Sequence, residues 1–433
     1  MEREKISTNN VDEYSPAPAP GYLGADCGYV PPVGRWGSQW PPDSQWPNER
    51  ALTEWPDGHP LPLPQWDEPR GAREPLSIPN VEAYEDLVAQ LELAQQQLLA
   101  RHNYNSVGNF VKLYEGYKSN PWGYTSLSDY YQVYKPPISA SHHTCVGLAF
   151  ELLARCGSLE QRWPGLSEHL NFASCEEAVK DIHAYVQASD DGLPDQWMVD
   201  KEHVVVYFKF ILDGRLGYAV MDQGYHVARV VTVMIDGQYP HTGDFTQQLE
   251  NNTETIYSYA ISPSHPDYIV WTLRSTNHST GKSDGHVSLI YVGAPFCSPV
   301  DVTERRNLVY EFRSIVARDT KGTPLAGLHF KVKLSDALDL TVFYRVKGEK
   351  VRVKIPFARI QVDQPDLGLT PYELKAIDTC NKQLHYEEGK LRSIIISCAL
   401  ILRDTQYVSQ MLDINETINE LMDLESYMEE REE

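Results

Sequence analysis

The feature that most constrains the fold of this chain is a change in the spacing of its apolar residues near residue 203. Before that point apolar residues recur at helical intervals, most clearly in Val81 to Leu99 and in the segment that begins at Cys145. Beyond it they form short runs rich in valine, isoleucine and tyrosine, separated by glycine, aspartate and asparagine, which is typical of strands. Helices followed by largely antiparallel strands predict an α+β fold.

The first of these runs, Val204 to Leu212, ends at Asp213-Gly214, a pair that predicts a tight hairpin turn into Tyr218–Met221. A pair of helices is expected in 158–188, and the chain becomes helical again from Pro371. Further strands are predicted at 227–235, 255–261, 269–275, 287–292, 308–317, 328–334 and 340–360.

Composition divides the chain into four parts. Residues 1–80 hold fifteen of the 29 prolines and five of the nine tryptophans, which predicts an extended arm. The arm is expected either to lie on its own domain or to dock on a protein partner. A helical subdomain is expected at 81–190, an antiparallel β-barrel or sheet with a lid at 191–365, and an acidic helical extension at 366–433, whose last helix either packs on its own domain or pairs with a partner.

Charge and cysteine content narrow the possible partners and the compartment. The formal net charge of -22 argues against nucleic acid or an anionic membrane surface as a partner. Seven cysteines without regular spacing do not form a disulfide framework and suit a reducing compartment. Because no apolar segment opens the chain and no apolar run is long enough to span a bilayer, we expect a soluble cytoplasmic protein.

Cys145 stands in the first turn of a predicted helix that ends near Gly157 and has an otherwise apolar inner face. Unpaired N–H groups and the helix dipole at such a position favour a thiolate over a thiol. The alternative is that Cys145 is one more small, buried apolar residue. A reactive Cys145 needs partner residues that a merely buried cysteine does not, so the presence of such partners distinguishes the two interpretations.

A thiolate nucleophile needs an imidazole to move protons, and the imidazole needs a carboxylate to orient it. His203 stands at the head of the first predicted strand, and Asp222 follows the strand that returns from the Asp213-Gly214 turn. A hairpin with this register would place the two side chains near each other. We therefore predict that Cys145, His203 and Asp222 form a catalytic triad.

Two other arrangements are open on the sequence alone. His286 also heads a predicted strand and is followed by Asp301, which gives a second possible triad with Cys145. A zinc set of His142, His143, Cys145 and His226 lacks the ligand spacing of known zinc motifs, so no metal is expected.

The order of cysteine helix, strand-head histidine and return-strand aspartate resembles that of the transglutaminase-like, papain-related thiol enzymes. Within that group, the chain is most similar to the arylamine N-acetyltransferases over about residues 85–330. The similarity is carried by the Cys145 helix, by Asp222-Gln223-Gly224-Tyr225, which resembles the family's Asp-x-Gly-Phe turn, and by 262–270 and 284–287. The family's Arg-Gly-Gly before the cysteine is replaced here by 141–144.

This resemblance implies transfer of an acetyl or other acyl group from a coenzyme A thioester to Cys145 and then to a small-molecule amine. Acetyl-CoA would be the donor, the triad would need no cofactor, and Tyr225 and His226 are candidates for contacting the donor. The alternatives are a thiol hydrolase, a protein-crosslinking transglutaminase, or a non-catalytic scaffold that uses the arm or the acidic C-terminal helix to bind proteins.

Overall fold

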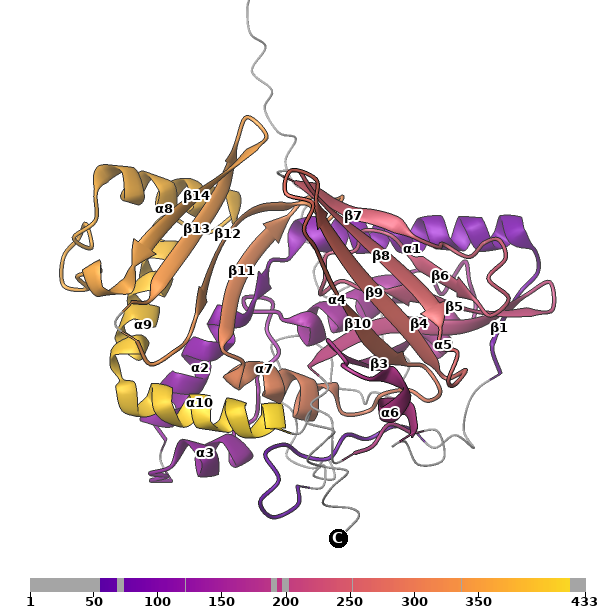
Figure 1. Ribbon diagram of the computed structural model, residues 1–433, viewed down its shortest axis with the longest axis horizontal. Helices are drawn as coiled ribbons and strands as arrows, with labels where there is room; N and C mark the ends of the chain where they lie inside the picture. The colour runs from indigo at the N-terminus through magenta and orange to yellow at the C-terminus, as the bar shows by residue number, and fades with distance from the viewer. Residues whose placement is uncertain are drawn as a thin grey trace, which may run out of the picture.

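The computed structural model describes residues 55–67, 74–120, 122–187, 193–196, 202–250, 252–335 and 337–420. Two mainly antiparallel sheets stand side by side, with helices from both ends of the chain packed around them (Figure 1). This arrangement confirms the α+β prediction. No helix in these ranges combines the length and the apolarity that crossing a bilayer needs.

The larger sheet has nine strands in the order β6-β5-β4-β3-β10-β9-β8-β7, and the short β1 runs parallel to β4. At the predicted hairpin between β4 and β5, Asp213 and Gly214 both adopt positive φ, as a tight two-residue turn requires. The strands are β1 (Leu76–Ile78), β3 (Asn171–Glu176), β4 (His203–Leu212), β5 (Arg215–Met221), β6 (Val231–Met234), β7 (Phe245–Glu250), β8 (Thr253–Ile261), β9 (Tyr268–Asn277) and β10 (Ser283–Tyr291).

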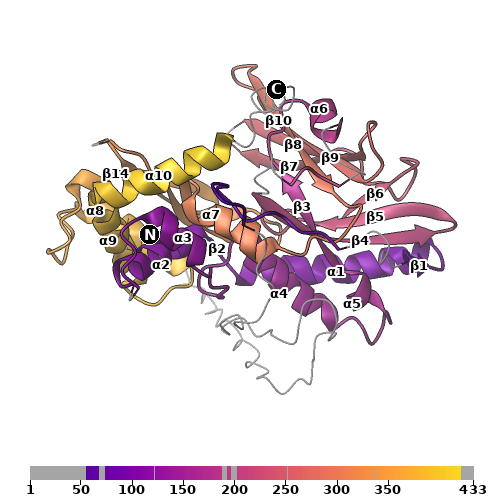
Figure 2. The ribbon, with the colours of Figure 1, turned by 90° about the horizontal axis from the view of Figure 1, so that it is seen from below.

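Two helices cover one face of this sheet, α1 (Val81–Arg101) and α4 (Cys145–Gly157). Figure 2 shows both lying along β4. Their leucines and the valines and phenylalanines of β4 form one core cluster. The opposite face holds a second cluster around Trp271, which packs against the rings of Tyr225, Tyr257 and Tyr259. The short helices α5 (Leu166–His169) and α6 (Ile182–Gln187) flank β3.

The smaller sheet has the order β14-β13-β12-β11-β2 and shares one core with the remaining helices. Its strands are β2 (Tyr104–Asn105), β11 (Phe312–Arg318), β12 (Pro324–Lys331), β13 (Asp339–Val346) and β14 (Glu349–Pro356). The helices of this core are α2 (Ser106–Lys118), α3 (Leu127–Val133), α7 (Arg305–Val309), the short 3-10 turn η3 (Phe357–Arg359), α8 (Pro371–Gln383), α9 (Lys390–Arg403) and α10 (Thr405–Glu420). The π-helical turn η2 (Pro299–Glu304) precedes α7, and its Val300 and Val302 belong to the core between α4 and the large sheet.

The structure corrects the sequence-based elements in three places. The expected helical pair at 158–188 is present only as the short helices α5 and α6, because 171–176 between them forms β3 in the middle of the large sheet. All six residues of β3 are buried, so they carry no alternating pattern. The expected strand at 308–317 starts only at Phe312, after the helix α7. The run 340–360 is two strands joined by a turn at Lys347-Gly348.

Part of the proline-rich arm lies on the body of the protein. Trp55 stacks edge-on against Tyr131 at 6.0 Å between ring centroids, and the Arg305 guanidinium lies 5.0 Å from the Trp55 ring. Trp66 forms an isolated bridge with Phe296 and contacts its ring. Residues 1–54, with the repeated Ser-Gln-Trp-Pro motif, and the acidic segment 421–433 lie outside the described residues.

Candidate active site

Cys145 is the first residue of α4, and the segment before it is held from two directions. The Asn105 N–H donates to the His143 carbonyl at 2.7 Å, and the Asn105 side-chain amide donates to the Ser141 carbonyl at 2.9 Å. On the other side, the Thr144 hydroxyl donates to the carboxylate of Glu304 instead of capping the helix. The helix start that carries the sulfur is thus fixed by both β2 and η2.

His203 and Asp222 meet at the open end of the β4–β5 hairpin. The His203 Nε2 lies 3.2 Å from the Asp222 Oδ1, and both residues are almost completely buried. Val206 pairs with Met221, so the residue opposite Asp222 is Val205. His203 comes two residues before Val205 on the same strand, and its side chain therefore lies diagonally across from Asp222 on the same face of the hairpin. Burial lowers the pKa of His203, but the charge of Asp222 and hydrogen bonding to Asp222 and Cys145 outweigh it, so the pKa lies well above its ordinary value.

The turn after Asp222 brings this pair against Cys145. The Gln223 amide donates to the Cys145 carbonyl at 3.1 Å, and the Tyr225 N–H donates to the Asp222 Oδ1 at 2.9 Å. Gly224 lies between the side chains of His203 and Cys145, since a Cβ added there would stand 2.6 Å from the His203 Cε1 and 2.9 Å from the Cys145 Cβ. The sulfur, the imidazole and the carboxylate therefore come together at one place.

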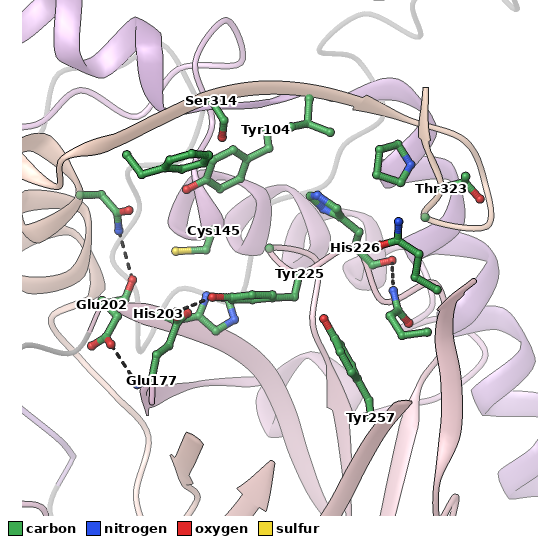
Figure 3. Close-up of a pocket in the computed structure, with 18 of the residues that line it drawn as sticks. Tyr104, Cys145, Glu177, Glu202, His203, Tyr225, His226, Tyr257, Ser314 and Thr323 are labelled. Carbon is green, nitrogen blue, oxygen red and sulfur yellow. Dashed lines mark hydrogen bonds between the residues drawn. The ribbon is translucent and has the colours of Figure 1, made fainter. Parts of the chain in front are cut away.

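Cys145 and His203 line a cavity of about 460 Å³ between the two sheets, and Asp222 lies buried behind His203 (Figure 3). The large sheet contributes one wall through β4, β7 and β8, and the small sheet contributes the other through β2 and β11–β13. Residues that line the cavity include Tyr104, Cys145, Glu177, Glu202, His203, Tyr225, His226, Tyr257, Arg306, Tyr310, Ser314 and Arg345. Cys145 is one of the lining residues, although it is almost completely buried.

Tyr225 and His226 both line the cavity and are both held by other side chains. The Tyr225 hydroxyl donates to a carboxylate oxygen of Glu177, and its ring stands edge-on to the His203 ring at 5.0 Å. His226 has a positive φ of 67° and lies against Arg318, whose Nη1 is 2.7 Å from the His226 Nδ1. Burial and the charge of Arg318 lower the pKa of His226 well below its ordinary value, so its Nδ1 accepts this hydrogen bond.

Glu304 was not predicted from the sequence, and this buried carboxyl group binds the residue before Cys145. Glu304 accepts hydrogen bonds from Thr144 and from Asn109, and its side chain is 1% exposed. Burial raises the pKa of Glu304 to about 7, against the hydrogen bonds and the positive charge of Arg313. Glu304 is 160 residues from Thr144 along the chain, and no local sequence signal connects them.

Replacing Glu304 with glutamine is expected to change the pH dependence of stability. A carboxyl whose pKa rises on folding stabilises the fold below its unfolded value, and that contribution is lost as pH rises through about 7. The free energy of unfolding of the wild type should therefore fall relative to Glu304→Gln by about 2–3 kcal/mol between about pH 5 and pH 8. Urea denaturation at several pH values measures the difference.

A matched control for this measurement is Glu115→Gln on α2, because the Glu115 side chain is 55% exposed. Its stability difference from the wild type should change little over the same range. A constant difference between the wild type and Glu304→Gln would contradict the raised pKa of Glu304.

The alternatives from the sequence are not assembled at this cavity. His286 lies on β10 opposite Leu273, with its ring 6.4 Å from the Trp271 ring, and it is not among the lining residues. Within the described residues, one ligand atom from each of His102, His143 and Glu151 lies within 4.8 Å of the others.

This cluster contains His143 but not His142, Cys145 or His226 of the zinc set considered from the sequence. The Arg155 Nη2 lies 3.1 Å from the His102 Nε2 and so occupies one of the two ring nitrogens of His102. Its positive charge also opposes a cation. We therefore assign no metal to this cluster.

Comparisons with known proteins give a weak structural likeness and no match in sequence. No family model matches the sequence, and no curated protein matches it. One solved structure, an arylamine N-acetyltransferase from Mycobacterium abscessus, aligns over 73% of this chain and 94% of that protein. The identity is 12% and the TM-score is 0.32, which does not place the chain in that family.

Proposed function

We propose that this protein is a thiol acyltransferase of the arylamine N-acetyltransferase type. In this proposal Cys145 is the nucleophile, and His203 is the base that takes the Cys145 proton and then the acid that protonates the leaving group. Asp222 orients and charges the imidazole. The donor is a coenzyme A thioester such as acetyl-CoA, and the acceptor is a small-molecule amine. Tyr225 and His226 would contact the donor from the cavity wall.

The observation that carries the proposal is that Cys145 and His203 lie next to each other at a cavity wall, with Asp222 hydrogen-bonded to the imidazole. The raised pKa of His203 favours an imidazolium next to the sulfur, and an imidazolium stabilises a thiolate. The N-terminus of α4 adds a favourable dipole for the same negative charge.

The reaction needs two steps. The Cys145 sulfur forms a bond to the thioester carbonyl carbon, and the bond from that carbon to the coenzyme A sulfur breaks as His203 protonates the leaving thiolate. An amine nitrogen then attacks the acyl-cysteine, loses a proton to His203 and releases the Cys145 thiolate. The acyl group, the protons and the charges are balanced over the two steps, and no further reactant is needed.

Mass spectrometry after exposure to acetyl-CoA tests this function. We expect one added acetyl group on Cys145, removed when an arylamine is supplied and absent in Cys145→Ser. Iodoacetamide near neutral pH should also label Cys145 well before the other six cysteines. Equal labelling of all cysteines with no acetyl adduct would reject the proposal and favour the scaffold alternative, whereas loss of the acetyl group to water alone would identify a hydrolase.

A further inference from the structure

The tyrosine opposite Cys145 has no part in the triad but lies where the reaction develops negative charge. Tyr104 lines the cavity with Cys145 and His203, and Figure 3 shows its hydroxyl end directed toward Cys145. Among the residues that the structure describes, no hydrogen bond to this hydroxyl is found. The Tyr104 ring is half-buried at the cavity wall, and its free hydroxyl lies on the cavity side.

The backbone holds Tyr104 in register with the start of α4. Tyr104 pairs with Val316 across the small sheet, and the next residue, Asn105, donates from its backbone and its side chain to the carbonyls of His143 and Ser141. Because these carbonyls precede Cys145 by two and four residues, a short, hydrogen-bonded path joins Tyr104 to the sulfur. A donor fixed in this way needs no rearrangement during the reaction.

We propose that the Tyr104 hydroxyl donates a hydrogen bond to the oxyanion formed when Cys145 attacks an acyl donor, an inference that rests on the proposed function. In that step a bond forms between sulfur and carbonyl carbon, and the π electrons of the carbonyl move to its oxygen. Tyr104 keeps its proton and shares it with this oxygen until the carbonyl re-forms and the leaving group departs. The Cys145 backbone N–H, at the first position of α4, is the second donor.

The surroundings of Tyr104 keep it in the donor form. Burial raises the pKa of Tyr104 well above its ordinary value, and the negative charges of Cys145 and Glu304 raise it further. The phenol therefore stays protonated at the pH where the Cys145 thiolate reacts. Tyrosine is a suitable donor for this role because its rigid ring carries the hydroxyl at a fixed distance from the backbone.

The variant Tyr104→Phe tests the proposed role of Tyr104 with two reagents, of which only one reacts with Cys145 through an oxyanion. p-Nitrophenyl acetate acetylates a thiolate through an oxyanion, whereas iodoacetamide alkylates it by direct displacement of iodide without one. In Tyr104→Phe, we expect p-nitrophenyl acetate to acetylate Cys145 about 100-fold more slowly than in the wild type. Iodoacetamide should alkylate Cys145 of this variant at the wild-type rate, within about twofold. Nitrophenolate release and mass spectrometry measure the two rates.

Tyr407→Phe is the matched control, because the Tyr407 hydroxyl also lacks a hydrogen-bond partner but lies in the core at α10. It should react with both reagents as the wild type does. Equal acetylation rates in Tyr104→Phe and the wild type would overturn the role of Tyr104 but leave the acyltransferase proposal standing. An equal loss of acetylation and alkylation in Tyr104→Phe would also overturn that role, because it would show that Tyr104 only supports the structure. A wild type that p-nitrophenyl acetate does not acetylate at Cys145 would overturn both.

Discussion

Asp222→Asn is expected to lower acyl transfer by about 10⁴-fold while leaving the fold in place. In the wild type, burial alone would lower the pKa of His203, and the Asp222 charge is the first of the interactions that reverse this effect. Asparagine keeps the shape of the side chain but removes the charge. His203 would then be neutral near pH 7, and Cys145 would hold its proton.

The rate of iodoacetamide alkylation of Cys145 as a function of pH measures this change directly. In Asp222→Asn the rate should rise only at a pH well above that of the wild type, because the thiolate no longer has an imidazolium partner. Asp267→Asn is the control, since Asp267 is an exposed carboxylate near His265 and lies outside the lining of the cavity. An unchanged pH profile in Asp222→Asn would show that Asp222 does not charge His203.

Gly224→Ala is expected to reduce acyl transfer by at least about 100-fold through one added methyl group. The new Cβ would stand 2.6 Å from the His203 Cε1 and 2.9 Å from the Cys145 Cβ, closer than carbon atoms approach without displacement. The two side chains would have to separate, and displacements of about 1 Å at a reacting centre cost about this much. Single-turnover acetylation of Cys145 measures the loss.

Gly217→Ala separates this effect from a general loss of stability. Its Cβ would meet the Met234 sulfur and the Phe210 ring, each at 2.6 Å, near the far end of the same hairpin. We expect this variant to unfold at lower urea concentration but to keep its acetylation rate per folded molecule. If Gly217→Ala lost as much acetylation as Gly224→Ala, instability would explain both, and the contact at Gly224 would have no special part.

The local parts of the site could be predicted because short-range chemistry decides them. Helical spacing places Cys145 at a helix start, and the Asp213-Gly214 turn fixes which strand residues face each other on β4 and β5. The exact register could not be read in this way: His203 and Asp222 lie on a diagonal rather than directly opposite. Strand β3 was missed because a fully buried strand shows no alternation of apolar and polar residues.

The class of fold, the helix that presents Cys145 and the hairpin that carries His203 and Asp222 could all be predicted, since each depends on residue spacing within about twenty residues. Tertiary packing alone divides the strands into two sheets with a cavity between them, and it alone brings Tyr104 and Glu304 to the segment around Cys145. These contacts join residues far apart in the chain, and burial selects them through the packing of whole elements, which leaves no periodic signal in the sequence.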